Sequence, residues 1–130
     1  MTKAHTRKPT VLVVDDAAAV STTLVWVLRE SGYNCTAAGS RSEALHLCAG
    51  LAPDLALIEV NLPDGSGMEA ARDLHHRVPG CKMLLMSGDP DTLDDVTEAR
   101  RAGVNCEVLP KPIPVKELLQ RVRDALAQPA

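Results

Sequence analysis

The residues of this chain that could take part in chemistry stand where short apolar segments end. They are Asp15 and Asp16 after the run 11–14, Glu59 after 55–58, Ser87 after 82–86, and Lys111 after the segment 106–109. Two carboxylates a few ångströms apart repel each other by about 4 kcal/mol at an effective dielectric constant near 20. Once gathered, the acids would need either a proton on one carboxyl or a divalent cation between them.

The types of these side chains favour one cation and one class of reaction. Asp15, Asp16 and Glu59 offer only oxygen ligands, and an incomplete set of such ligands favours Mg²⁺, which keeps several water molecules. The ammonium of Lys111 could hold one oxygen of a phosphoryl group, and Ser87 could donate to another. This set is typical of phosphoryl transfer, in which the protein positions groups and neutralises charge. The more ordinary alternative is that Asp15 or Asp16 caps a helix.

The segments before these residues predict the elements that position them. Residues 55–58 are apolar without polar alternation, which is typical of a strand covered on both faces. Pro63, Gly65 and Gly67 prevent the strand from continuing. Open α/β sheets place their sites at the carboxyl ends of strands, so we expect the chemical residues at one edge of a parallel sheet.

Along the chain, predicted strands alternate with predicted helices. We expect strands at about 10–15, 34–38, 54–59, 82–86 and 107–109, and helices at about 17–31, 40–50, 66–77, 89–101 and 115–126. Gly32 should close the first helix, the second should end near Gly50, and Trp26 should broaden the apolar face of the first. The alternation and the short connections predict an α/β domain, a doubly wound five-stranded parallel sheet with five helices.

Length and composition set the organisation of the chain. Its 130 residues predict one domain at 10–127, after a disordered leader at 1–9 and before a tail at 128–130. The net charge of -3 and the lack of a basic stripe argue against direct nucleic acid contact. The four cysteines lack the spacing of metal ligands and are expected to be buried, reduced thiols. No signal or membrane segment follows the N-terminus, so we expect a cytoplasmic protein without membrane contact.

Four motifs together resemble the receiver domain of two-component response regulators, over residues 10–127. They are Val11-Leu-Val-Val-Asp-Asp16, Leu62-Pro-Asp-Gly-Ser-Gly67, Met86-Ser-Gly88 and Leu109-Pro-Lys-Pro112. The resemblance implies a flavodoxin-like sheet of strand order 2-1-3-4-5 and a Lys111-Pro112 bond that is often cis. It also implies that Asp15, Asp16 and the backbone carbonyl of Asn61 bind Mg²⁺, and that Ser87 and Lys111 contact a phosphoryl group.

Two positions depart from the pattern of this family. Glu59 stands where the family has its phosphoacceptor aspartate, and its extra methylene moves the carboxylate by about 1.5 Å. An in-line attack is sensitive to misplacement on this scale. Val108 stands where the family usually has a Tyr or Phe that turns inward on activation. Both departures affect the activation of a receiver: the first concerns its phosphorylation, and the second the side-chain rotation that accompanies activation.

Three functions are consistent with this sequence. In the first, which we expect, the chain is an atypical receiver whose Glu59 reaches toward Lys111 and imitates a phosphorylated state. It would then be a signalling and protein-interaction module and not an enzyme. In the second, Glu59 accepts a phosphoryl group from a histidine kinase, as in a conventional receiver. In the third, the chain is a magnesium-dependent phosphatase. A further alternative is that Glu59 results from an engineered substitution of an original aspartate by glutamate.

The partners follow from the same resemblance. We expect a sensor histidine kinase, or an output domain or partner protein. Two copies could also pair through the fourth helix, fifth strand and fifth helix. Charged residues of both signs on this face would permit such a homodimer: Asp94, Asp95, Arg100, Arg101 and Lys116.

Overall fold

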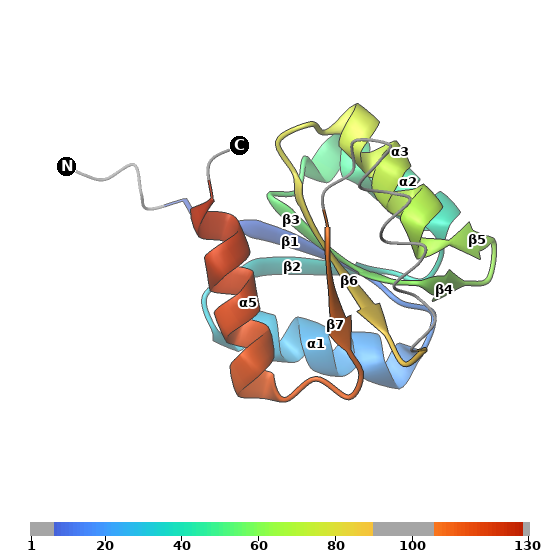
Figure 1. Ribbon diagram of the computed structural model, residues 1–130. Helices are drawn as coiled ribbons and strands as arrows, with labels where there is room; N and C mark the ends of the chain where they lie inside the picture. The colour runs from blue at the N-terminus through green and yellow to red at the C-terminus, as the bar shows by residue number, and fades with distance from the viewer. Residues whose placement is uncertain (1–6, 90–105, 129–130) are drawn as a thin grey trace.

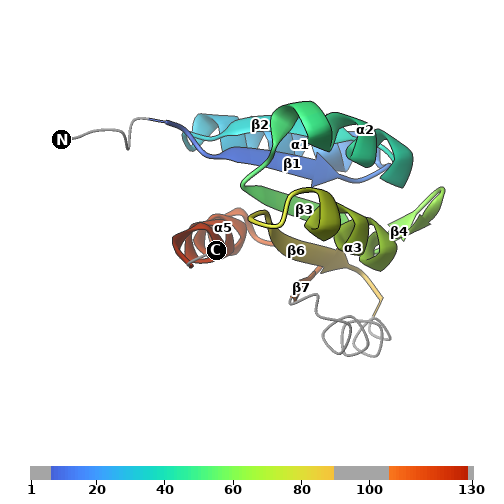
Figure 2. The same cartoon turned by 90° about the horizontal axis from the view of Figure 1, so that it is seen from above.

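The computed structural model describes residues 7–89 and 106–128, and a parallel sheet of five strands forms its centre (Figure 1). The strands are β1 (Thr10–Val14), β2 (Asn34–Ala38), β3 (Leu55–Glu59), β6 (Lys82–Ser87) and β7 (Glu107–Pro110). Their order is β2-β1-β3-β6-β7, and each neighbouring pair is parallel. Figure 2 shows β1, β3, β6 and β7 in succession across the sheet. The predicted fold class and strand order are confirmed.

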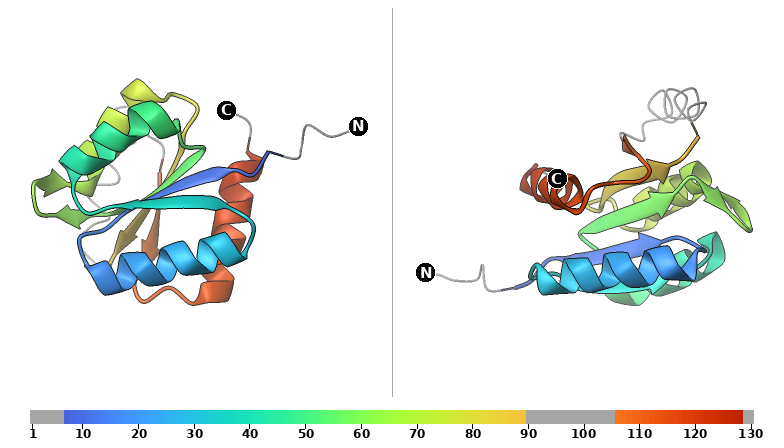
Figure 3. Two further views of the ribbon diagram at one scale, coloured as in Figure 1. Left: turned by 180° about the vertical axis from the view of Figure 1, so that it is seen from behind. Right: turned by 90° about the horizontal axis from the view of Figure 1, so that it is seen from below.

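Four helices lie within the described residues, and they cover both faces of the sheet. They are α1 (Ala18–Glu30), α2 (Arg41–Leu51), α3 (Gly67–Arg77) and α5 (Val115–Ala127). α1 and α5 pack on one face, and α2 and α3 pack on the other (Figure 3). The helix predicted at 89–101 lies outside the described residues, apart from Asp89.

Burial on both faces explains why the strands read as unbroken apolar runs. Successive side chains of a strand point to opposite faces. Leu12 of β1 packs in the cluster that includes α2 and α3, whereas its neighbour Val13 packs in the cluster that includes α1 and α5. Each is fully buried, which stabilises the fold by roughly 1.5–3 kcal/mol per side chain.

Serine caps begin the two helices on the α2 and α3 face. The Ser40 hydroxyl accepts a hydrogen bond from the Glu43 N–H at 3.0 Å. At α3 the Ser66 hydroxyl accepts from the Glu69 N–H, and the Glu69 carboxylate accepts from the Ser66 N–H, which completes a capping box. Each cap satisfies N–H groups that the first turn of a helix leaves without partners.

The ends of the first two helices differ in how well the sequence predicted them. Gly32 follows α1 with φ of 100°, and the Tyr33 N–H binds the Leu28 carbonyl, as in a glycine-terminated helix. The helix α2 includes Gly50 and ends at Leu51, and its C-cap Ala52 adopts a left-handed conformation with φ of 44°. The expected end near Gly50 is therefore confirmed to within one residue, although Ala52 and not the glycine is the left-handed cap. The Ala52 N–H still binds the Cys48 carbonyl at 2.9 Å, so the helical hydrogen bonds continue past the glycine.

A short antiparallel ladder follows β3, and the sequence did not predict it. β4 (Asn61–Leu62) pairs with β5 (Gly65–Ser66). In the turn between them, the Asp64 carboxylate accepts hydrogen bonds from the N–H groups of Arg41 and Ser42 at 2.8 and 2.9 Å. The hairpin thus caps the N-terminus of α2, where a negative charge is favourable. The hydrogen bonds from the backbone N–H groups of Ser42 and Arg41 lower the pKa of Asp64, and that from Ser42 has the larger effect.

The predicted place of Trp26 in the apolar face of α1 is wrong, because its side chain is 65% exposed. Leu24 and Leu28 supply the face that packs on the sheet. Trp26 lies two residues from each of them, which is about 200° around the helix. Val115, the first residue of α5, is also half exposed.

The chain contacts the sheet before β1 begins. The Arg7 guanidinium donates to one oxygen of Asp54 at 2.9 Å, and the Thr10 N–H donates to the other at 2.8 Å. The Pro9 carbonyl accepts from the Asn34 N–H of β2. Residues 7–9 of the predicted leader are therefore attached to the domain.

The remaining expectations concern the cysteines and the membrane. Cys35, Cys48, Cys81 and Cys106 are all buried, as predicted. Burial raises the pKa of the Cys35 thiol to about 11 and that of the Cys81 thiol to about 12. None of the described helices has the length and apolar character that crossing a membrane requires.

Candidate functional site

The carboxyl ends of the central strands bring the predicted site residues to one edge of the sheet. Glu59 is the last residue of β3 and pairs with Met86, the residue before Ser87 in β6. Asp15 directly follows β1, and its N–H donates to the Ala38 carbonyl at the end of β2. The Lys111 N–H donates to the Ser87 carbonyl at 2.8 Å, so the end of β7 lies beside that of β6.

The ammonium of Lys111 lies between two of the three acids. Its Nζ donates to Asp15 Oδ2 at 2.9 Å and to Glu59 Oε1 at 2.5 Å. The side chain of Asp15 is 1% exposed and that of Glu59 12%, whereas that of Lys111 is 24% exposed. Partial burial acts to lower the pKa of Lys111, but the hydrogen bonds to Glu59 and Asp15 outweigh it and raise this pKa. The amine therefore supplies part of the neutralising charge that the crowded acids require.

The other carboxylate oxygen of each of the two acids bound by Lys111 accepts a hydrogen bond from a backbone N–H. Asp15 Oδ1 accepts from the Ala17 N–H at 2.9 Å, and Glu59 Oε2 accepts from the Asn61 N–H at 3.2 Å. The bond to Ala17 lies just before α1, whose N-cap residue makes no side-chain cap bond of its own. Asp15 thus serves both as a turn-forming acid and as a partner of Lys111.

Gly67 packs directly against the backbone of Glu59 and Val60. Its N–H donates to the Val60 carbonyl at 2.6 Å. A Cβ atom at position 67 would lie 2.2 Å from the Glu59 carbonyl oxygen and 2.8 Å from Val60 Cα, so no other residue fits without moving the backbone. The sequence indicates Gly67 only as a turn residue, and its close approach to Glu59 follows from the fold.

The other predicted side chains, those of Ser87 and Asp16, are not the partners to which Lys111 Nζ donates in these two contacts. Ser87 is buried, and its hydroxyl exchanges hydrogen bonds with the backbone of Asp89: it accepts at 2.9 Å and donates at 3.3 Å. Asp16 is exposed and forms no hydrogen bond or ion pair with another residue in the described part of the chain. The Lys111-Pro112 peptide bond is cis, as the resemblance implied.

The charges and donor atoms of the site fit a hydrated divalent cation. Three carboxylates and one ammonium leave a formal charge of -2, from -3 for Asp15, Asp16 and Glu59 and +1 for Lys111. Within residues 7–89 and 106–128, no three His, Cys, Asp or Glu side chains form a metal site by themselves. A cation here would therefore need a backbone carbonyl and water besides carboxylate oxygens, and proteins commonly hold Mg²⁺ with water among its ligands.

Comparison with known proteins decides which family this site belongs to. Residues 11–123 match the family model of the response regulator receiver domain. The chain belongs to this family. It is 33% identical to the probable transcriptional regulatory protein TcrX of Mycobacterium tuberculosis, over 97% of this chain and 53% of that protein. It is also 33% identical to the DNA-binding response regulator MtrA of the same species, over 93% of this chain and 52% of MtrA. The chain therefore spans about half the length of these curated relatives.

Solved receiver structures share the fold. A CheY-like receiver from Methanospirillum hungatei aligns with a TM-score of 0.85 at 27% identity, covering 92% of this chain and 94% of that one. The receiver domain of an HD domain-containing protein from Pseudomonas fluorescens aligns with a TM-score of 0.84 at 31% identity, covering 92% and 88%. The regulator TrrA of Thermotoga maritima, solved in complex with Mg²⁺ and BeF, aligns with a TM-score of 0.79 at 25% identity, covering 90% and 98%.

Proposed function

We propose that this receiver domain is a signalling and protein-interaction module in which Glu59 takes the place of a phosphorylated aspartate. One observation carries the proposal: Glu59 Oε1 reaches Lys111 Nζ at 2.5 Å while Lys111 also binds Asp15. The longer glutamate side chain spans the distance to the ammonium and brings its negative charge there without a modification. In this proposal the receiver presents one surface at all times.

The same contacts make Glu59 a poor phosphoacceptor. One of its oxygens is bound by the ammonium and the other by the Asn61 N–H. Because catalysis by positioning depends on placement within about 1 Å, the displacement by one methylene also moves the nucleophile from the place of the shorter acid. Membership of the receiver family favours a signalling role over the magnesium-dependent phosphatase, so we infer that the domain is not an enzyme.

The experiment that tests this role compares the parent with Glu59→Asp. Both proteins are incubated with Mg²⁺ and acetyl phosphate, and intact mass is measured before and after hydroxylamine. We expect no phosphoryl adduct on the parent and a hydroxylamine-labile adduct on Glu59→Asp, with Glu59→Gln as the control that lacks any acceptor. A labile adduct on parental Glu59 would instead support the conventional receiver that accepts phosphate from a histidine kinase.

Magnesium is part of the proposal, with Asp15, Asp16, Glu59 and the carbonyl of Asn61 as its ligands. Asp16 is exposed at the strand edge, and the TrrA complex shows that a relative of this fold is found with the ion. We expect Mg²⁺ to raise the melting temperature of the parent, and Asp16→Asn to abolish the shift. Asp124→Asn, on the distant helix α5, is the matched control and should retain it. An unchanged parental melting temperature would argue that the acids serve only local structure.

The partners remain those that the family suggests. TcrX and MtrA are regulators about twice as long as this chain, and MtrA is a DNA-binding protein by name. We infer that this domain acts in the cytoplasm with a sensor histidine kinase or an output domain, without contacting nucleic acid itself. The homodimer through the fourth helix, fifth strand and fifth helix stays a prediction, because residues 90–105 lie outside the described part.

A further inference from the structure

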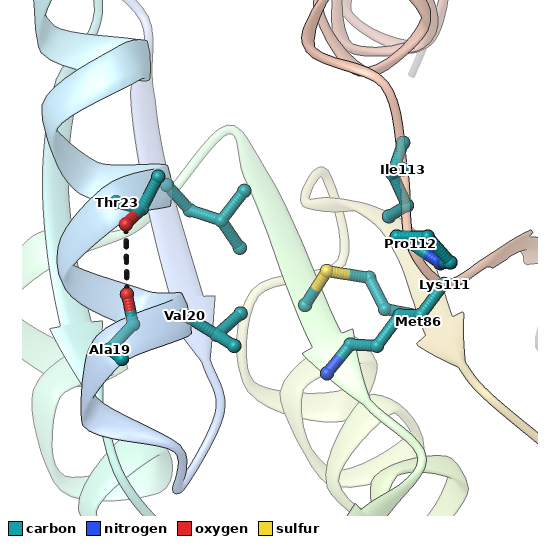
Figure 4. A pocket seen from close by; sticks show the side chains of 8 residues that line it. Ala19, Val20, Thr23, Met86, Lys111, Pro112 and Ile113 are labelled. Carbon is teal, nitrogen blue, oxygen red and sulfur yellow. Dashed lines mark hydrogen bonds between the residues drawn. The ribbon is translucent and has the colours of Figure 1, made fainter.

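The backbone of Asn61 is the point at which the hairpin of β4 and β5 meets the Glu59 site. The Lys111 side chain extends toward the end of β3 (Figure 4), and its Nζ binds one carboxylate oxygen of Glu59. The other oxygen accepts from the Asn61 N–H at 3.2 Å. Asn61 is exposed and is the first residue of β4, so Glu59 is bound in part by a residue that lies outside the central sheet.

The pairing of β4 with β5 directs both backbone groups of Asn61 away from the ladder. Asn61 pairs with Ser66, and the Gly67 N–H donates to the Val60 carbonyl just beyond this pair. In an antiparallel ladder, such a bond flanks a pair that exchanges no hydrogen bonds of its own. The contacts agree, because the Asn61 N–H donates to Glu59 and the Ser66 N–H donates to the carboxylate of the capping box. The Asn61 carbonyl, which we propose as a Mg²⁺ ligand, points to the same side of the strand as its N–H.

A ladder of two residue pairs needs further support, because an isolated two-stranded hairpin is at best marginally stable in water. The turn between β4 and β5 receives this support from the first turn of α2. The Asp64 carboxylate accepts from the N–H groups of Arg41 and Ser42 at 2.8 and 2.9 Å, one through each oxygen. Bonds to two consecutive N–H groups fix both the position and the direction of the turn relative to α2.

The Arg41 side chain extends this attachment to α3. Its guanidinium donates to one oxygen of Asp73, through Nε at 2.9 Å and through Nη2 at 2.7 Å, and Nη1 lies 3.9 Å from an oxygen of Glu69. The same side chain crosses Gly65 of β5, where a Cβ atom would lie 3.3 Å from Arg41 Cδ. Arg41 therefore binds the hairpin through its backbone, packs on it through its side chain, and joins it to α3 through its charge.

We propose that Asp64 and Arg41 are positioning residues for Asn61, which they hold at the site by fixing the hairpin to α2 and α3. Their own bonds go to these two helices, so their effect reaches Glu59 through Asn61. The hairpin keeps the Asn61 N–H on Glu59 Oε2, which leaves Oε1 to Lys111, and it keeps the Asn61 carbonyl directed outward for Mg²⁺. The role toward Mg²⁺ rests on the proposed function, whereas the role toward Glu59 needs only the contacts of the structure.

The test is NMR spectroscopy of the isotope-labelled 130-residue chain, first without Mg²⁺. The variant Glu59→Ala removes the acceptor and gives the amide proton shift of an Asn61 N–H that lacks this hydrogen bond. We expect Asp64→Ala and Arg41→Ala each to move the Asn61 amide shift at least half of the way from the parental value to that of Glu59→Ala. The amide shifts of β1 and β3 should stay close to their parental values.

Arg77→Ala is the matched control. Arg77 also joins α3 to α2, through the Leu45 carbonyl at 3.4 Å, but it lies at the end of α3 opposite the hairpin. It should therefore keep the parental Asn61 shift. A second series adds Mg²⁺ and measures its apparent affinity. We expect Asp64→Ala and Arg41→Ala to weaken this affinity about fivefold, the effect typical of losing one helix cap, and Arg77→Ala to leave it unchanged.

The two series separate this inference from the proposed function. A parent that shows no response to Mg²⁺ counts against the magnesium site, whereas the Asn61 shift still decides the positioning role. That role is overturned if Asp64→Ala and Arg41→Ala keep the parental Asn61 shift. It is equally overturned if the amide shifts of β1 and β3 move as far as that of Asn61, because the variants would then loosen the whole domain. Should Asp64→Ala fail to fold, Arg41→Ala decides, since it leaves both N–H donors to Asp64 in place.

Discussion

The close approach of Gly67 to the end of β3 predicts a large effect from the smallest possible substitution. In Gly67→Ala the new methyl group would lie 2.2 Å from the Glu59 carbonyl oxygen and 2.9 Å from its carbonyl carbon. These neighbours are backbone atoms, so no change of rotamer relieves the overlap. Overpacking of this kind costs about 1–3 kcal/mol, whereas alanine in a helix gains at most about 1 kcal/mol over glycine. We expect a net loss near 2 kcal/mol.

Urea unfolding and thermal melting measure this loss, and the chain offers a matched control. Gly50 also lies in a helix, and a Cβ atom there would meet nothing within 4 Å. Gly50→Ala should therefore gain about 0.5 kcal/mol from helix propensity and a smaller unfolded-state entropy. For a domain of this size the melting temperature should fall by about 8 °C in Gly67→Ala and rise by about 2 °C in Gly50→Ala. The same exchange is expected to have opposite signs at the two positions.

A Gly67→Ala protein as stable as the parent would refute the reasoning. It would mean that the junction of β5 and α3 can move away from β3 at little cost. The hairpin of β4 and β5 would then not determine the position of Glu59 relative to Lys111.

Three further predictions follow from the ionic contacts and the buried thiols. Lys111→Met should lower the free energy of unfolding at pH 7 by about 3 kcal/mol, since it leaves the buried Asp15 carboxylate without its cation; urea unfolding of both proteins measures this loss, and a variant as stable as the parent would contradict it. Burial acts to raise the pKa of Asp54, but the Thr10 N–H and Arg7 outweigh it and lower this pKa below its ordinary 3.8. Its stabilisation is therefore complete above pH 3.8 and lost as the pH falls through the lowered value, so Asp54→Asn should be about 1 kcal/mol less stable than the parent at pH 7 and equal to it in strong acid. Because burial raises the pKa values of Cys35 and Cys81 to about 11 and about 12, a thiol reagent at pH 8 should label them in urea and not in the native protein, and native labelling at the unfolded rate would contradict the buried placement.

The sequence predicted the sheet and the membership of the site because both depend on local patterns. Each strand is an apolar run that stops at a polar residue, and parallel strands must bring those stops to one edge. This is why Asp15, Glu59, Ser87 and Lys111 were identified together. The prediction needed only the order of the strands and no knowledge of how the side chains pack.

What the sequence could not show depends on residues far apart in the chain. The sequence predicted that Glu59 reaches toward Lys111, but the second bond of Lys111, to Asp15 96 residues away, is a matter of tertiary geometry. The Asp64 cap on α2 likewise joins residues 23 positions apart. The apolar pattern of residues 17–28 places Trp26 on the buried face of the helix, because the pattern does not show which side of the helix meets the sheet. Trp26 lies on the side of α1 away from Leu24 and Leu28, which pack on the sheet, and is therefore exposed.

The division of the interior by the sheet has a consequence for how substitutions combine. Leu12 and Val13 are covalent neighbours, yet they pack in separate compartments with different helices. Leu12 instead shares its compartment with Leu74 of α3, more than sixty positions along the chain. Paired substitutions should therefore be closer to additive between these sequence neighbours than within one compartment, so the spacing of two mutations along the chain is a poor guide to their epistasis.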